Sequence, residues 1–127
     1  MAAAGISTVG SKVTILGLTF KEDCPDLRNS KVPDIIRELR QYGCDIQVHD
    51  SWCDPIEAAE EYGLELTPQE KLHQASAIIL AVAHKSYRDW TPEEWRQLLL
   101  PSGVIADVKN IVPARAMEQA GYLVWRL

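Results

Sequence analysis

The sequence lacks the features that would place it in several large classes of protein. Its 127 residues contain no apolar run close to the roughly 20 residues that cross a bilayer. The net charge of −5 leaves no broad basic face for nucleic acid. The first residues show neither the charged nor the apolar segment of a secretory signal. We therefore expect no membrane span and no nucleic-acid partner.

Cysteine is scarce, and its spacing carries no signature. Cys24, Cys44 and Cys53 form neither a CxxC pair nor a Cys/His cluster with zinc spacing. An odd count argues against a disulfide scaffold and favours a reduced, cytoplasmic chain without a metal site. No His lies close to Cys24 in the sequence, so we interpret this thiol as a small apolar filler and not as a nucleophile.

The glycines of a dinucleotide site are missing as well. A Gly-x-Gly-x-x-Gly turn would be needed after the first strand, but only Gly17 is present, followed by the bulky Thr19 and Phe20. Asp50 holds the place of a ribose-binding acid, yet without those glycines we interpret it as a turn or capping residue. The acids of a phospho-receiver domain are also absent from the ends of the first and central strands. Neither site is expected in this chain.

What the sequence does contain is a regular alternation of strand and helix patterns. Apolar segments at 12–18, 45–50, 75–82, 104–108 and 122–125 predict strands, and a pattern at 113–119 predicts the last helix. This order predicts an α/β fold, a Rossmann-like three-layer sandwich with a mostly parallel, doubly wound sheet. Residues 12–127 are expected to form one domain. Residues 1–11 are expected to be a loose tail, either vector-derived or the cut end of something longer.

Four helix starts are marked by capping residues. Asn29 or Ser30 should cap the first helix, with Gly43 just past its end. Three later starts share the order cap, proline, acid, as in a capping box: Asp54-Pro55-Ile56-Glu57, Thr67-Pro68-Gln69-Glu70 and Thr91-Pro92-Glu93-Glu94. We expect these helices to end near Gly63, near His73 and at Leu100-Pro101.

The segment between the first strand and the first helix is unusually long. Such loops usually take about 2–6 residues, whereas this one spans 17–30 and carries Lys21 and Arg28. Ligands of open α/β sheets bind beyond the carboxyl ends of the strands, so two cations there predict an anion site, with phosphate as the expected anion. The alternative is that both cations form weak surface ion pairs with neighbouring acids.

The loop also carries a family resemblance. Residues 17–30, GLTFKEDCPDLRNS, closely resemble the motif that opens the C-terminal domain of the UDP-glucose/GDP-mannose dehydrogenase family. The Cys-Pro-Asp-Leu-Arg-Asn part is most similar to the UDP-N-acetylhexosamine 6-dehydrogenase branch. The segments 81–84 and 106–109 are similar to two later motifs of that branch. The resemblance covers residues 12–127.

This resemblance implies a UDP-sugar-binding domain of a larger enzyme. Members oxidise the C6 hydroxyl of a nucleotide sugar to a carboxylate in two hydride transfers to NAD, as part of polysaccharide-precursor synthesis. An N-terminal domain would bind NAD, a central region would carry the catalytic Cys, and both are missing here. The chain alone is therefore expected to be inactive. The full-length enzyme is expected to be a homodimer or a larger assembly.

The resemblance also implies roles for four residues. Phe20 and Lys21 match the pair that contacts the substrate, and Lys109 matches a cationic position of the same pocket. Arg28 matches the arginine that reaches the NAD bound by the other domain. None of the three cysteines matches the catalytic motif, so no catalytic residue is expected in this chain.

Several assignments stay open at the level of sequence. His84, which ends the central strand, fits a ligand contact and a backbone partner about equally well, and Asp107 favours a backbone or Lys partner over a general base. The competing hypothesis for the whole chain is a free-standing α/β interaction or regulatory module without chemistry.

Overall fold

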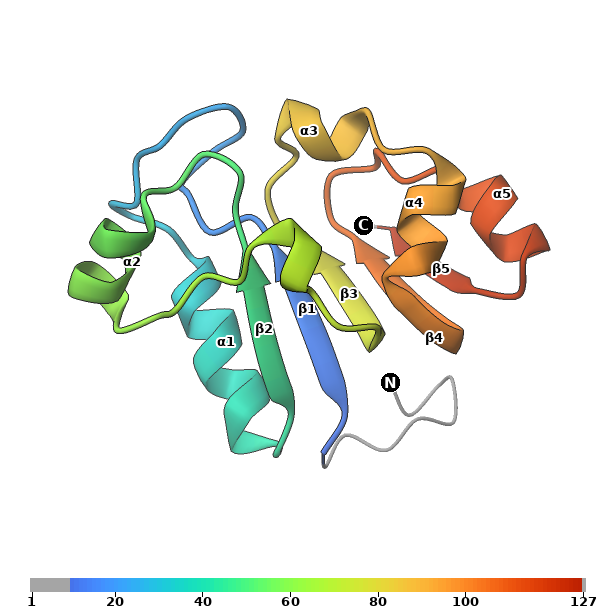
Figure 1. The fold of residues 1–127 in the computed structure, drawn as a ribbon, viewed down its shortest axis with the longest axis horizontal. Coiled ribbons are helices and arrows are strands. Elements are labelled where there is room, and N and C mark those ends of the chain that lie inside the picture. Colours follow the sequence, from blue (N-terminus) through green and yellow to red (C-terminus); the bar gives the residue numbers. More distant parts are fainter. Residues whose placement is uncertain (1–9, 127) are drawn as a thin grey trace.

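Five parallel strands form the sheet of this protein (Figure 1). The structure is a computed structural model that describes residues 10–126. The strands are β1 (Lys12–Leu16), β2 (Asp45–His49), β3 (Ala75–Leu80), β4 (Leu99–Asp107) and β5 (Leu123–Arg126), in the order β2-β1-β3-β4-β5. Every pairing is parallel, which confirms the predicted α/β, Rossmann-like class. The strand order reverses between β1 and β3, where ligands of such sheets bind.

Helices cover both faces of the sheet. They are α1 (Val32–Gln41), α2 (Pro55–Tyr62), the 3₁₀ turn η2 (Gln69–Lys71), α3 (Lys85–Arg88), α4 (Pro92–Gln97) and α5 (Ala114–Gln119). Ile36 of α1 and Ala58 of α2 belong to one buried cluster. Tyr87, Trp95 and Met117, from α3, α4 and α5, belong to a second. The doubly wound arrangement is as predicted.

The strands feed both clusters because successive side chains point to opposite faces of a sheet. On β1, Ile15 joins the first cluster and Leu16 the second. On β3, Ala77 joins the first and Ile78 the second. Burial of a large aliphatic side chain contributes roughly 1.5–3 kcal/mol. The continuous apolar run of β3 is therefore explained by burial on both of its faces.

The predicted helix caps are correct at two of the three Pro-containing starts. Asp54 caps α2 by accepting a hydrogen bond from the N–H of Ile56 at 2.9 Å. Thr91 and Glu94 form a reciprocal capping box at α4. The helix predicted after Thr67 is wrong, because this segment forms only the three-residue turn η2.

The boundaries of β1 and α1 also differ from the prediction. β1 ends at Leu16 because Gly17, with a φ of +98°, turns the chain out of the strand. Neither Asn29 nor Ser30 holds the N-cap of α1, which is Lys31. Asn29 adopts a left-handed conformation with a φ of +64° inside the preceding loop, and the helix begins at Val32, two residues after Ser30.

The predicted helix that ends at Leu100-Pro101 is too long. α4 ends at Gln97, and Leu99 already pairs with Ala75 as the first residue of β4. The apolar residues 98–100 fit a helix and a strand equally well, and pairing with β3 decides between them. α3 was not predicted, because four residues are too few to show a helical period.

Residues 1–9 of the expected tail lie outside the described residues. Gly10 and Ser11 are tied to the sheet: the N–H of Gly10 bonds the carbonyl of Gly43, and the N–H of Asp45 bonds the carbonyl of Ser11, both at 2.8 Å. Within residues 10–126, no helix has the length and apolar character to cross a bilayer. The same residues contain no group of three or more His, Cys, Asp or Glu side chains placed to hold a metal ion.

A substitution of Gly17 tests the close packing of β1 against the end of β3. A Cβ at Gly17 would lie 2.5 Å from Val82 Cβ and 2.7 Å from Val82 N. Val82 is held there by a hydrogen bond from its N–H to the carbonyl of Leu16. Gly17→Ala therefore combines a positive φ with overpacking, and we expect it to lower the free energy of unfolding in urea by roughly 3–5 kcal/mol.

Gly63→Ala is the matched control. Gly63 also has a positive φ, +65°, but a Cβ there would meet nothing within 4 Å. The control should lose only the backbone penalty of about 1–2 kcal/mol. Equal losses in the two variants would contradict the close approach at Gly17.

Candidate functional site

The segments that follow β1, β3 and β4 share the carboxyl edge of the sheet. Phe20 and Lys21 follow β1, His84 follows β3, and Lys109 follows β4. These three strands are neighbours and parallel, so their carboxyl ends lie side by side. Figure 1 shows their arrowheads directed toward the edge that carries the 17–30 loop and α3. The predicted substrate residues therefore emerge from one edge.

A hollow of about 240 Å³ lies at this edge, and we call it the rim hollow. Phe20 and Lys109 both line it, together with Lys31 and the apolar side chains of Ile79 and Val82. Phe20 is 53% exposed, so its ring is accessible to a ligand. An exposed aromatic ring and two cations beside an apolar floor suit a ligand with a flat ring and a negative charge.

Lys31 is a lining residue that sequence reasoning missed. It is the N-cap of α1, and its side chain makes no capping hydrogen bond. A cation is unfavourable at a helix N-terminus, where the helix dipole favours negative charge. This unfavourable placement was the sequence signal for Lys31, because a lysine beside the positive end of the helix dipole favours binding of an anion there.

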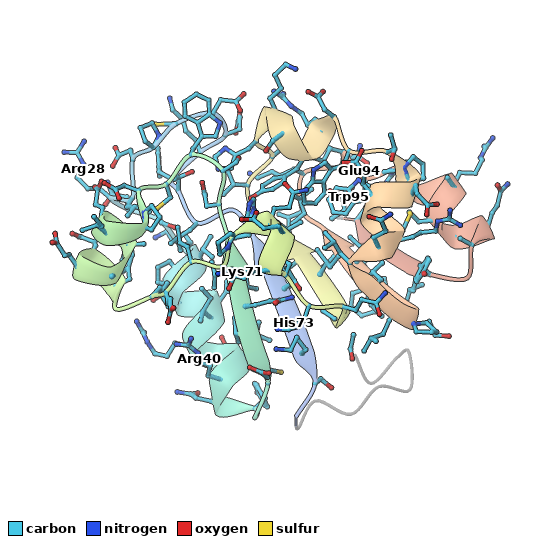
Figure 2. The ribbon with its side chains drawn as sticks, viewed as in Figure 1. Arg28, Arg40, Lys71, His73, Glu94 and Trp95 are labelled. Atoms are coloured by element: carbon cyan, nitrogen blue, oxygen red, sulfur yellow. The ribbon has the colours of Figure 1, made fainter. Side chains whose placement is uncertain are left out.

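Lys21 and Arg28, the other two predicted residues, do not line the rim hollow. Lys21 is exposed on the loop. The Nε and Nη2 of Arg28 donate to the carboxylate of Asp26 at 3.1 and 3.2 Å, and this pairing lowers the pKa of Asp26. The side chain of Arg28 is 81% exposed, so the ion pair is weak and the guanidinium faces solvent. Figure 2 shows Arg28 at the outer side of the loop.

Asp50 is the buried centre of the carboxyl edge. Its Oδ2 accepts hydrogen bonds from the N–H groups of Leu18 at 2.6 Å and Thr19 at 3.1 Å. Its Oδ1 accepts from the N–H groups of Trp52 at 2.7 Å and Cys53 at 2.8 Å. The carboxylate thus joins the start of the 17–30 loop to the turn after β2, which confirms Asp50 as a turn residue.

His84 completes this buried network. Its Nε2 lies 2.9 Å from Asp50 Oδ2, its Nδ1 accepts the N–H of Asp23 at 2.9 Å, and its side chain is fully buried. Burial acts to raise the pKa of Asp50, but the hydrogen bonds from His84 and from the N–H of Leu18 outweigh it and hold the pKa at about 2. The sequence allowed either a ligand contact or a backbone partner for His84, and the structure shows a backbone partner, the N–H of Asp23.

The same network decides how this loop relates to a dinucleotide. In a Rossmann site, backbone N–H groups after the first strand face the pyrophosphate. Here the N–H groups of Leu18 and Thr19 are taken by Asp50. The loop does not offer them to a phosphate, which agrees with the missing glycines.

Asp107 plays a smaller but similar part beside Lys109. Its carboxylate accepts the N–H of Lys109 at 3.2 Å and the N–H of Val112 at 2.8 Å. The turn includes Asn110 with a φ of +61°. Asp107 is therefore a backbone partner, as the sequence favoured, and it fixes the direction in which Lys109 leaves β4.

The thiol of Cys53 is unsuited to nucleophilic chemistry. Burial raises the pKa of the Cys53 thiol to about 12, so it stays protonated at neutral pH. Cys44 is buried and Cys24 half-buried.

Comparison with known proteins assigns the chain to a family. Residues 14–114 match the family model described as the UDP binding domain of the UDP-glucose/GDP-mannose dehydrogenase family. That match covers well over half of the chain. The chain belongs to this family.

Sequence relatives of this UDP binding domain point to one branch. Over 118 residues the chain is 39% identical to the UDP-N-acetyl-D-glucosamine 6-dehydrogenase of Salmonella typhi. The alignment covers 93% of the chain and 28% of that protein. It is 38% identical over 123 residues to Protein CapL of Staphylococcus aureus, covering 97% of the chain and 28% of that protein. The chain therefore spans little more than a quarter of the length of these relatives.

Solved structures agree with the fold of this UDP binding domain. The crystal structure of NDP-N-acetyl-D-galactosaminuronic acid dehydrogenase from Methanosarcina mazei Go1 superposes with a TM-score of 0.85 at 23% sequence identity. The alignment covers 98% of this chain and 27% of that one. At this identity the likeness shows a shared fold.

Asp50→Asn tests the buried centre of the UDP binding domain. An amide has a single acceptor oxygen, so its NH₂ group must face backbone donors on one side of Asp50. We expect the free energy of unfolding at pH 7 to fall by roughly 2–4 kcal/mol. Because the pKa of Asp50 lies below its ordinary value of 3.8, the wild-type advantage is present above about pH 4 and is lost as the pH falls toward 2.

Asp54→Asn is the control for the same chemical change at an exposed cap. Asn caps helices as well as Asp, so the control should stay within about 0.5 kcal/mol of wild type. Urea unfolding between pH 7 and pH 2 measures the free energy of unfolding of wild type, Asp50→Asn and Asp54→Asn. A gap between Asp50→Asn and wild type that does not narrow below pH 4 would rule out an ionised, hydrogen-bonded Asp50.

Proposed function

We propose that this chain is the nucleotide-sugar-binding domain of a longer NAD-dependent dehydrogenase that oxidises C6 of a UDP-N-acetylhexosamine to a carboxylate. The observation that carries the proposal is the rim hollow of a UDP binding domain, where Phe20, Lys31 and Lys109 meet. The name of the relative from Salmonella typhi, a UDP-N-acetyl-D-glucosamine 6-dehydrogenase, supports the N-acetylhexosamine branch and an oxidoreductase activity. Residues 12–127 are the domain in this proposal, and nothing in the comparisons favours a free-standing module.

In this proposal, different residues at the carboxyl edge contact different parts of the ligand. Phe20 offers a flat apolar face to the base or the sugar ring. Lys109 and Lys31, with Lys21 on the adjoining loop, are point charges that suit the diphosphate. All are exposed in this chain, which is expected if the other half of the pocket comes from the preceding domains. Contact between domains would exclude water and strengthen each of these charges.

The chain's own residues fit a peripheral role toward NAD. Leu18 and Thr19 give their N–H groups to Asp50, so the dinucleotide belongs to the N-terminal domain. NAD, when bound there, supplies the hydride acceptor for the oxidation. Arg28, exposed at the outer side of the loop, is the group that would reach across to it. No residue of this chain is assigned to catalysis, and the complete enzyme is proposed to be a cytoplasmic homodimer or larger assembly.

Calorimetric titration of the chain with UDP tests the substrate site. Lys109→Ala and Lys21→Ala each remove a cation from the edge, and Phe20→Ala removes the aromatic face. We expect each change to weaken binding about five- to tenfold, since tenfold corresponds to about 1.4 kcal/mol. Lys71→Ala, a cation on η2 that does not line the rim hollow, is the control. Equal affinities in wild type, Lys109→Ala and Lys71→Ala would refute the proposed site.

The proposed role of Arg28 is tested in the complete dehydrogenase. Arg28→Ala should raise the KM for NAD severalfold and leave the KM for the UDP-sugar nearly unchanged, because the guanidinium lies outside the rim hollow. Arg40→Ala removes a similar charge at the opposite end of α1 (Figure 2) and should change neither constant. An unchanged KM for NAD in Arg28→Ala would contradict the role.

A further inference from the structure

The 17–30 loop depends on its surroundings for its shape. It contains neither strand nor helix. Its start is tied to Asp50 through the N–H groups of Leu18 and Thr19, and near its end the hydroxyl of Ser30 donates to the carbonyl of Leu18 at 2.6 Å. Phe20, which lines the rim hollow, lies between these ends. The N–H of Phe20 bonds the carbonyl of Asp26 at 2.7 Å, which closes the loop on itself but does not join its middle to the rest of the domain.

Asp23 provides that middle tie. Its N–H donates to Nδ1 of His84 at 2.9 Å. Its carboxylate accepts the N–H of Lys85 at 2.8 Å and the Nη2 of Arg88 at 3.0 Å. The residue adopts a left-handed backbone with a φ of +55°, a conformation that such a residue keeps when its surroundings fix it. The loop is thus joined to the start of α3.

The partners of the His84 ring, which are Asp23 at Nδ1 and both Asp50 and, at 3.2 Å, the hydroxyl of Thr19 at Nε2, determine where its proton lies. Nδ1 accepts a backbone N–H, so it carries no proton. Nε2 therefore carries the proton and donates it to Oδ2 of Asp50. The ring touches Asp50, which holds Thr19, and it touches Asp23. Phe20 and Lys21 lie between Thr19 and Asp23, so one buried ring joins both flanks of the proposed substrate pair.

We propose that His84 is a positioning residue that sets the place of Phe20 and Lys21 at the rim hollow through its bond to the N–H of Asp23. The inference rests on the proposed function for the identity of the ligand. The placement of the loop can be measured without any ligand. His84 touches no substrate in this account and acts through the backbone of the loop.

Two amide substitutions of His84 separate the roles of its two ring nitrogens. In His84→Gln the amide nitrogen takes the place of Nε2 and keeps a donor for Asp50, but Asp23 loses its acceptor. In His84→Asn the amide oxygen takes the place of Nδ1 and keeps the acceptor for Asp23, but Asp50 loses its donor. Gln47→Leu is a control for lost buried hydrogen bonds, since Gln47 bonds Thr14 and His73 away from the loop.

The readouts are amide hydrogen exchange at Phe20 and Asp23 and the affinity of the 127-residue chain for UDP. We expect His84→Gln to lower the protection of both amides and to weaken UDP binding about tenfold, as for a loop that holds the binding conformation about a tenth of the time. His84→Asn should stay closer to wild type in both readouts. Gln47→Leu should lower stability without changing either readout.

The outcomes distinguish the two proposals. Loop protection in His84→Gln that equals wild type overturns the positioning role, and so does loop protection lost equally in Gln47→Leu. Reduced protection with unchanged UDP affinity also overturns it, because the loop would then not govern the site. A wild-type chain that does not bind UDP, with reduced loop protection in His84→Gln alone, overturns the proposed function and retains His84 as the residue that places the loop.

Discussion

The fold at the carboxyl edge depends on one buried carboxylate. Asp50 accepts four backbone N–H groups from two separate segments and faces the ring of His84. A buried charge is costly unless it is fully hydrogen-bonded, and here each oxygen has at least two donors. Within the described residues, no buried side-chain N or O atom lacks a hydrogen-bond partner. The network therefore fixes the loop without leaving an unsatisfied group.

This constraint explains why the site differs from that of a dinucleotide-binding domain of similar topology. In both, the first loop after β1 faces the switch point of the sheet. Here the backbone donors of that loop turn inward to Asp50, while Phe20 turns outward to the rim hollow. Positive charge at the rim comes from side chains and not from the loop backbone. The domain is thus suited to present side chains to a ligand held jointly with another domain.

The sequence was sufficient to predict the alternation of strands and helices but not every boundary. The residue pattern of 17–30 indicated the family. The alternation of apolar segments with helical patterns predicted the parallel sheet, because a strand buried on both faces has a continuous apolar sequence. Residues 98–100 were assigned to a helix, since their period is ambiguous and pairing with β3 decides. The Asp50–His84 bond, by contrast, joins residues 34 positions apart. Contacts of that kind have no local signature.

The most direct test of the central claim is an NMR titration of the ¹⁵N-labelled chain with UDP. The account predicts that the largest amide shifts cluster at residues 18–23, at 31 and at 108–110, while residues at the opposite edge, such as Arg40 and His73, stay unchanged. Shifts that instead cluster on α5 or at the amino edge of the sheet would contradict it.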